Sequence, residues 1–205
     1  MNGFRRDIVQ CGKKIVDLGL VKATSGNISL RGDNSFFVTP SGYPLSSLSE
    51  ELIVEVDSHG NVLYSASSGA CYEKIKPSME TKLHLAVYNA HPTAKAIVHA
   101  HPLYATIIGT ITEIKPLTYE AAAFIYPIDY VPPVLPGTPE LADYVGKTQA
   151  KVIVLKNHGV VVWGETLAEC IFRMQVVEEN AEQIFVAKSF GKMPEIPLDE
   201  VLKLS

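Results

Sequence analysis

The chain has 205 residues, of which 47% are hydrophobic and 20% charged, a balance typical of a folded globular protein rather than a disordered one. Its 18 lysines and arginines are outnumbered by 22 aspartates and glutamates, and the net charge of −4 argues against a nucleic-acid partner, which normally requires a basic surface. The sequence has no signal peptide and no run of the about 20 apolar residues that a membrane span needs, so we expect a cytoplasmic protein without a membrane partner.

Hydrophobic periodicity and turn residues predict the secondary structure. In chain order we expect a helix over 4–18, strands over 27–31, 36–39 and 52–57, a hairpin turn over 57–61, a strand over 62–64, a helix over 79–90 capped by Ser78, a strand over 95–101, a helix over 103–110, a helix starting at 138–140, strands over 151–156 and 160–163, and a helix over 166–189. Many neighbouring strands are joined by hairpin-like turns. This order predicts one layered α/β domain over residues 1–205, with a largely antiparallel sheet covered by helices.

The cysteines carry no disulfide or zinc-knuckle pattern. Cys11, Cys71 and Cys170 are odd in number, widely spaced and in no CxxC pair. A reducing compartment is therefore the simpler interpretation.

A His-x-His pair lies in the predicted strand over 95–101. Because alternate strand residues face the same side, His99 and His101 project together and could bind one metal ion. On a helix the two rings would diverge. A lone pair of this kind is more often two half-buried strand histidines, so both interpretations stay open at this point.

A third histidine, His158, lies in a glycine-containing turn between two valine-rich strands. Such a turn can direct the ring into a cleft at a strand end, although a solvent-exposed turn histidine fits the pattern equally well. Three histidines with one carboxylate make a catalytic zinc site. The other histidines are expected to be structural or at the surface: His59, His84 and His91.

The candidate carboxylate is Glu80, in the predicted first turn of the helix over 79–90. A negative charge there is also stabilised by the helix dipole, so the position alone does not prove a function. Ser78 at the same helix start, and the loops over 24–27 and 39–42, combine hydroxyl groups with backbone N–H groups that can bind an anion. Neither loop has the lysine of a P-loop.

Five motifs carry a resemblance to a known family. In order, they are SGNIS (25–29), TPSG (39–42), KPSMETKLH (76–84), AIVHAHPLYAT (96–106) and VLKNHGVVVWG (154–164). Together they resemble the class II aldolase/adducin-head family, and most of all its L-fuculose-1-phosphate aldolase branch. The resemblance implies a three-layer α/β/α sandwich that assembles into a homotetramer with active sites at subunit interfaces.

The resemblance also implies roles for individual residues. One Zn²⁺ per subunit, with Mn²⁺ or Co²⁺ as alternatives, would be held by Glu80, His99, His101 and His158. Glu80 would double as the catalytic acid/base, and Tyr119 would reach the active site of a neighbouring subunit. The substrate phosphate would be bound by Gly26, Asn27, Ser41, Gly42 and Ser78.

The implied reaction is reversible, zinc-dependent cleavage of a ketose 1-phosphate, such as L-fuculose 1-phosphate or a related deoxy-sugar phosphate, to dihydroxyacetone phosphate and an aldehyde. This chain departs from the aldolase branch at two places that bear on the identity of the substrate. Met79 replaces a second phosphate-binding serine, and residues 190–205 contain no tyrosine. The alternatives on this scaffold are methylthioribulose-1-phosphate dehydratase and pentulose-phosphate 4-epimerase. The epimerase fits less well because its branch has aspartate at position 80. A non-catalytic adducin-head-like binding module ranks last, because all four metal-ligand candidates are present.

Overall fold

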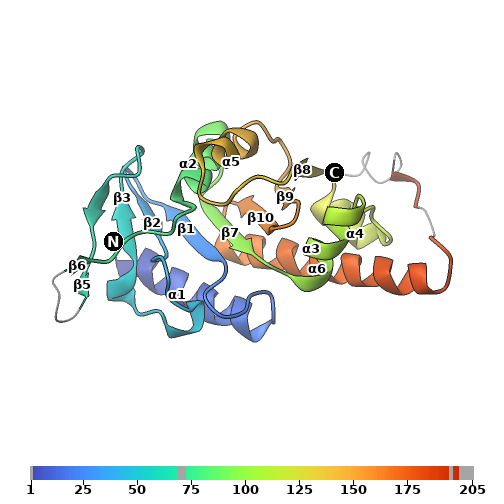
Figure 1. Ribbon diagram of the computed structural model, residues 1–205, viewed down its shortest axis with the longest axis horizontal. Coiled ribbons are helices and arrows are strands. Elements are labelled where there is room, and N and C mark those ends of the chain that lie inside the picture. Colours follow the sequence, from blue (N-terminus) through green and yellow to red (C-terminus); the bar gives the residue numbers. More distant parts are fainter. Residues whose placement is uncertain (1, 69–72, 194–195, 199–205) are drawn as a thin grey trace.

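The computed structural model describes residues 2–68, 73–193 and 196–198, and it consists of a long sheet with helices on both faces (Figure 1). The helices are α1 (Asn2–Asp17), α2 (Thr81–Ala90), α3 (Leu103–Ile111), α4 (Tyr119–Ile125), α5 (Pro139–Val145) and α6 (Leu167–Ser189), with short 3-10 turns at Leu45–Ser47 and Glu50–Leu52. The strands are β1 (Asn27–Arg31), β2 (Phe36–Val38), β3 (Val54–Val56), β4 (Val62–Tyr64), β5 (Ser67–Ser68), β6 (Glu73–Lys74), β7 (Ala96–Ala100), β8 (Ile128–Val131), β9 (Val152–Leu155) and β10 (Gly159–Gly164).

The main sheet has eight strands in the order β4-β3-β2-β1-β7-β10-β9-β8, and β5 and β6 form a separate hairpin. Every neighbouring pair is antiparallel except β8 and β9, which are parallel. The expected antiparallel α/β architecture is therefore confirmed. The central pairs, β1 with β7 and β7 with β10, join segments that lie far apart in the sequence.

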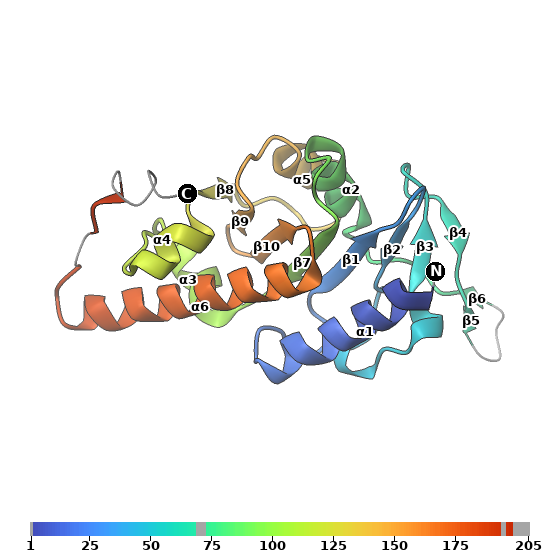
Figure 2. The ribbon, with the colours of Figure 1, turned by 180° about the vertical axis from the view of Figure 1, so that it is seen from behind.

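The helices form two layers. α1 and α6 lie together against one face of the sheet, and α2 and α5 lie together against the other (Figures 1 and 2). Both layers bury apolar side chains, so the central strands are apolar on both faces and are valine-rich instead of alternating with polar residues. This explains why the sequence over 152–163 contains nearly continuous valine runs.

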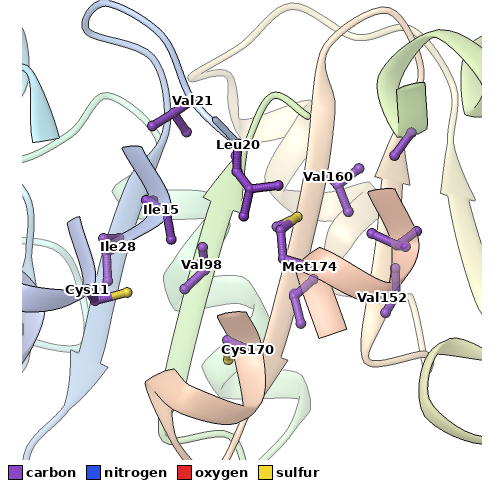
Figure 3. Packing of buried hydrophobic residues seen from close by; sticks show 14 of the residues in the cluster. Cys11, Ile15, Leu20, Val21, Ile28, Val98, Val152, Val160, Cys170 and Met174 are labelled. Carbon is purple, nitrogen blue, oxygen red and sulfur yellow. The ribbon is translucent and has the colours of Figure 1, made fainter. Parts of the chain in front are cut away.

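The larger core lies between the sheet and helices α1 and α6. Figure 3 shows Cys170 and Met174 of α6 packed beside Val98 and Val160 of the central strands. In β7 the even-numbered residues face this core, whereas Ile97 faces the smaller core under α2 and α5. His99 has the same parity as Ile97, so its side chain is directed to the α2 side of the sheet.

Several local features differ from the sequence expectation. α4 and β8 are not predicted, since α4 has only seven residues and β8 pairs with a strand more than twenty positions away. α2 begins at Thr81 rather than at 79, because 78–80 form a turn in which Ser78 accepts a hydrogen bond from the Thr81 N–H through its carbonyl. Glu80 is therefore the residue before the helix and not part of its first turn.

Two sequence expectations concern cysteines and membranes. Cys11 and Cys170 are free and buried, and Cys71 lies outside the described residues. Within the described part of the chain, no helix is both long and apolar enough to cross a membrane.

Candidate active site

The three predicted histidines meet at one end of β7 and β10. One potential ligand atom from each of His99, His101 and His158 can be chosen so that all lie within 4.8 Å of one another. Their ring centroids are 4.8 to 5.1 Å apart, and all three pairs meet edge to face. The fold therefore brings residues about sixty positions apart into one cluster.

Local backbone geometry directs each ring to this point. His99 is in β7 and His101 follows the strand end, so strand alternation places both on one face. His158 lies in the turn between β9 and β10, where Asn157 has a positive φ of 61°. Gly159 is next: an added Cβ would lie 2.5 Å from the Ala100 oxygen and 2.7 Å from Cδ2 of His101. Only glycine allows the turn to approach the His-x-His pair this closely.

The protonation of His99 can be assigned from its partner. Its Nδ1 atom is 3.0 Å from the Val160 carbonyl oxygen, which only accepts, so Nδ1 carries the hydrogen and Nε2 has the lone pair. Burial lowers the pKa of His99 to about 3, which keeps the ring neutral near pH 7. A neutral imidazole oriented by a carbonyl on its other nitrogen is the usual form of a metal ligand.

The carboxylate of Glu80 completes the cluster. Its Oε2 atom is 3.2 Å from Nε2 of His99, and its Oε1 atom is 3.5 Å from Nε2 of His158. Burial by itself raises the pKa of Glu80, but the hydrogen bond from the Asn27 amide to Oε2 favours the ionised form and holds the pKa below its usual value. Glu80 is thus an ionised, buried carboxylate beside three histidines.

This donor set fits a divalent metal ion. The lone pairs of His99 Nε2 and Glu80 Oε2 face each other, a repulsive contact unless a cation lies between them. Oε1 of Glu80 is buried and has no hydrogen-bond partner among the described residues. Three imidazoles and one carboxylate suit zinc and its neighbours in the first transition series.

One of the proposed phosphate-binding residues, Ser78, lies beside Glu80. Oγ of Ser78 accepts a 3.2 Å hydrogen bond from the Glu80 N–H. The loop over 39–42 runs next to the segment over 76–78, with Ser78 N bonded to the Thr39 oxygen and Ser41 N to the Lys76 oxygen. These contacts bring the loop that carries Ser41 next to the segment that carries Ser78, although the two are far apart in the sequence.

Gly26 and Asn27 lie on the β1 side of the cluster, and Gly42 lies in the same loop as Ser41. Asn27 is the direct neighbour of His99 in the β1–β7 register. Gly26 has a φ of 78°, and an added Cβ would lie 2.9 Å from the His99 oxygen, so this loop packs directly against the histidine strand. Gly42 also has a positive φ, 80°, and follows Ser41 at the surface. Gly26, Asn27 and Ser78 therefore contact Glu80 or the histidine strand, whereas Ser41 and Gly42 lie in a loop that is hydrogen-bonded to the segment before Ser78.

Tyr119 differs from these residues. It is the first residue of α4 and is 64% exposed, and it makes no hydrogen bond to the cluster within the described residues. Met79, immediately before Glu80, is 72% exposed. Of the remaining histidines, His59 is exposed in the β3–β4 turn and His91 is buried against Trp163.

Sequence reasoning missed one part of the site. His84 is fully buried and contacts Asn27, which in turn contacts Glu80. The signal was available: residues 80, 84 and 88 recur at four-residue spacing on the helix face that covers β1. Which strand the helix covers was not visible in the sequence.

Comparison with known proteins identifies the family. Residues 6–185 match the family described as "Class II Aldolase and Adducin N-terminal domain". The chain belongs to this family. The resemblance seen in the sequence motifs is therefore confirmed.

Relatives within the class II aldolase family carry two different activities. The chain is 35% identical to "L-fuculose phosphate aldolase" of Methanocaldococcus jannaschii, over 87% of this chain and 93% of the relative. It is 33% identical to "3-oxo-tetronate 4-phosphate decarboxylase" of Haemophilus influenzae, over 87% of this chain and 85% of the relative.

Solved structures in the family have the same fold. An L-fuculose 1-phosphate aldolase superimposes with a TM-score of 0.88 at 28% identity, covering 98% of this chain and 93% of the other. YgbL from Klebsiella pneumoniae, described as a putative aldolase/epimerase/decarboxylase, gives the same TM-score and identity. The α/β architecture is therefore that of the class II aldolase family, and the three-histidine cluster of this chain is consistent with a divalent metal site, while the named reaction differs between relatives.

Proposed function

We propose that this protein is a divalent-metal-dependent class II aldolase that cleaves a ketose 1-phosphate to dihydroxyacetone phosphate and an aldehyde. The observation that carries the proposal is the convergence of His99, His101 and His158 on the ionised carboxylate of Glu80. L-Fuculose 1-phosphate is the first substrate to test and zinc the first metal.

The proposed metal ligands are the three histidines, with Glu80 as a fourth when no substrate is bound. When bound, the metal would supply a Lewis acid for the negative charge that develops on the substrate oxygens as the carbon–carbon bond breaks. His99 contributes its Nε2 lone pair, and the Val160 carbonyl holds the ring in that orientation.

Glu80 is the proposed acid/base. In cleavage, it would donate a proton to the carbon of the three-carbon fragment that loses its bond, and in condensation it would remove that proton. Two observations support this role: Glu80 is buried beside three histidines, and its Oε1 atom accepts no hydrogen bond from the residues that the structure describes.

The phosphate would be bound by Gly26, Asn27, Ser41, Gly42 and Ser78, three of which contact Glu80 or the histidine strand. Their backbone N–H groups and hydroxyls suit an anion without requiring a lysine or arginine. Met79 is 72% exposed and provides no hydroxyl, so we expect a phosphate pocket with one donor fewer than its serine-containing counterparts.

Tyr119 is proposed to act in a neighbouring subunit of a homotetramer, taking the proton of the substrate C4 hydroxyl. Its 64% exposure at the start of α4 supports a role outside its own subunit. The apolar residues Leu103, Ile107 and Ile111, exposed along one face of α3, are consistent with a covered surface in an assembly.

A second candidate is decarboxylation of a 3-oxo-tetronate 4-phosphate, favoured by the relatives that carry this name. Loss of CO₂ from C2 of such a substrate, followed by protonation of that carbon, leaves dihydroxyacetone phosphate. The two reactions therefore share a product, a charge on the same carbon and a need for Glu80. They differ in the leaving group: an aldehyde requires a base for the C4 hydroxyl proton, whereas CO₂ requires none.

The experiment measures three outputs from zinc-loaded and chelated protein. These are release of dihydroxyacetone phosphate from L-fuculose 1-phosphate, its release from 3-oxo-tetronate 4-phosphate, and exchange of its own C–H proton with deuterated water. Metal-dependent release from the first substrate supports the aldolase, and release only from the second supports the decarboxylase. If zinc-loaded protein shows none of the three, the proposed function is wrong. The dehydratase, epimerase and binding-module alternatives are then the next to be tested.

A further inference from the structure

A chain of buried hydrogen bonds runs from Glu80 away from the histidine cluster. Nδ2 of Asn27 lies 2.8 Å from Oε2 of Glu80, and Oδ1 of Asn27 lies 2.5 Å from Nε2 of His84. Nδ1 of His84 lies 2.6 Å from Oγ of Ser29, which lies 2.8 Å from the Tyr88 hydroxyl. All five residues are buried.

The side-chain spacing of β1 and that of α2 together produce this chain of hydrogen bonds. Residues 27 and 29 alternate along β1 and face the same side, while residues 80, 84 and 88 follow one face of the turn and helix at α2. Ile28 and Leu30 of the same strand face the opposite, apolar core. The polar face of β1 is therefore buried against the polar face of α2.

The chemistry of the partners sets the direction of every hydrogen bond. An ionised Glu80 can only accept, so the amide nitrogen of Asn27 faces it and the amide oxygen faces His84. That oxygen also only accepts, so the His84 hydrogen is on Nε2. Its Nδ1 then accepts from the Ser29 hydroxyl, and Ser29 Oγ accepts from Tyr88. Every donor in this chain of hydrogen bonds is therefore directed toward Glu80.

The chain of hydrogen bonds places the two oxygens of the Glu80 carboxylate in different environments. Oε2 is held by Asn27, whereas Oε1 has no hydrogen-bond partner among the described residues. Nδ1 of His84 accepts from Ser29 while Nε2 donates to Asn27, so these contacts together fix the neutral Nε2–H form of the ring.

We infer that His84 is a positioning residue: through its Nε2–H it orients the Asn27 amide, which holds Oε2 of Glu80 and leaves Oε1 for proton transfer. The inference rests on the proposed function to the extent that Glu80 is the acid/base. It assigns Asn27 a second role beside phosphate binding, because its carbonyl and one amide hydrogen are already engaged within the protein.

The test compares two substitutions at one position. His84→Gln keeps an N–H donor at similar reach, and His84→Leu removes it. We expect zinc-loaded His84→Leu to lose about tenfold to a hundredfold in the maximal rate of dihydroxyacetone phosphate proton exchange, with little change in KM, because a misplaced catalytic group costs rate more than binding. His84→Gln should recover most of the rate.

His91→Leu is the matched control. His91 is also a buried histidine at α2, at its C-terminal end, and it bonds the Thr148 carbonyl rather than the chain to Glu80. Its loss should lower stability without lowering the exchange rate of the folded protein. A wild-type rate in His84→Leu, or equal losses in His84→Gln and His84→Leu, would overturn the positioning role.

A second readout does not depend on the reaction. Two-bond ¹H–¹⁵N correlation spectra of the full-length protein report which ring nitrogen carries the hydrogen, and we expect the neutral Nε2–H form of His84 at pH 7. An Nδ1–H form would overturn the inference even if the enzyme is active. If wild-type protein exchanges no proton, the proposed function fails, and the spectrum alone decides the hydrogen-bond direction.

Discussion

Nε2 of His99 faces Oε2 of Glu80 across 3.2 Å, in a position where neither atom carries a hydrogen. The contact is unfavourable for the apoprotein, because two lone pairs oppose each other in a buried site. A divalent cation held by His99 and Glu80 would remove this repulsion. The cluster is therefore built for metal binding at some cost to the metal-free fold.

The first prediction concerns metal removal. Chelation should lower the melting temperature, and zinc at a hundred times its dissociation constant should add about 2.7 kcal/mol to the free energy of unfolding. His101→Ala should remove this gain, while His59→Ala, which removes an exposed histidine, should keep it. Stoichiometric zinc retained by purified His101→Ala would exclude His101 from the ligand set.

The second prediction separates proton transfer from binding. Glu80→Gln preserves size and the hydrogen bond from Asn27 but cannot take a proton. We expect it to bind zinc and dihydroxyacetone phosphate, and to lose about 10²–10⁴-fold in proton exchange, the usual contribution of a positioned acid/base. Calorimetry measures binding, and deuterium incorporation measures exchange. An unchanged exchange rate would contradict the acid/base role.

The third prediction concerns the turn that delivers His158. Gly159→Ala places a methyl group 2.5 Å from the Ala100 oxygen, so strands β7 and β10 or the His101 ring must move. We expect a loss of about 1–3 kcal/mol in stability, as for other overpacked sites, together with weaker zinc binding. Gly3→Ala in α1, with open space around the added Cβ, is the control and should not destabilise the protein. Unchanged zinc affinity in Gly159→Ala would argue against the tight packing.

The fourth prediction is a pH dependence of stability in chelated protein. The pKa of His84 is about 3 in the folded state and 6.5 when unfolded. Between these values only the unfolded chain binds the proton, so stability is full above about pH 6.5 and falls as the pH drops toward 3, by up to about 1.4 kcal/mol per pH unit. Urea unfolding from pH 7 to pH 4 measures this. His84→Gln should show a shallower fall, and identical slopes would count against the buried neutral ring.

The fifth prediction uses Tyr119 to separate the two candidate reactions and to test a shared site. Tyr119→Phe should leave proton exchange intact and reduce aldol cleavage by about 10²–10⁴-fold, because the base for the C4 hydroxyl is lost. Subunits of Tyr119→Phe and Glu80→Gln, unfolded and refolded together, should regain cleavage if each site draws on two chains. No recovery in proven mixed oligomers would place Tyr119 outside the neighbour's site.

The sequence by itself identified the features that depend on near neighbours. Strand alternation predicted that His99 and His101 share a face, and the glycine turn at 157–159 predicted that His158 could reach a strand end. The helices α1, α3 and α6 and most strands also followed from periodicity, since local patterns determine which face of an element is apolar. The motif order identified the family before any contact was known.

Tertiary structure alone decided what depends on pairing between distant segments. The placement of β1 beside β7 brings Asn27 next to His99, and the packing of α2 over β1 buries His84 against Asn27. Sequence reasoning left His84 as a structural or surface histidine, because helix periodicity shows that residues 80, 84 and 88 share a face but not which residues that face contacts. Similarly, β8 has no strong local signal and forms through its parallel pairing with β9. The residue types of the site could be recognised from short sequence segments. The orientation of their side chains depends on long-range contacts that no single segment encodes.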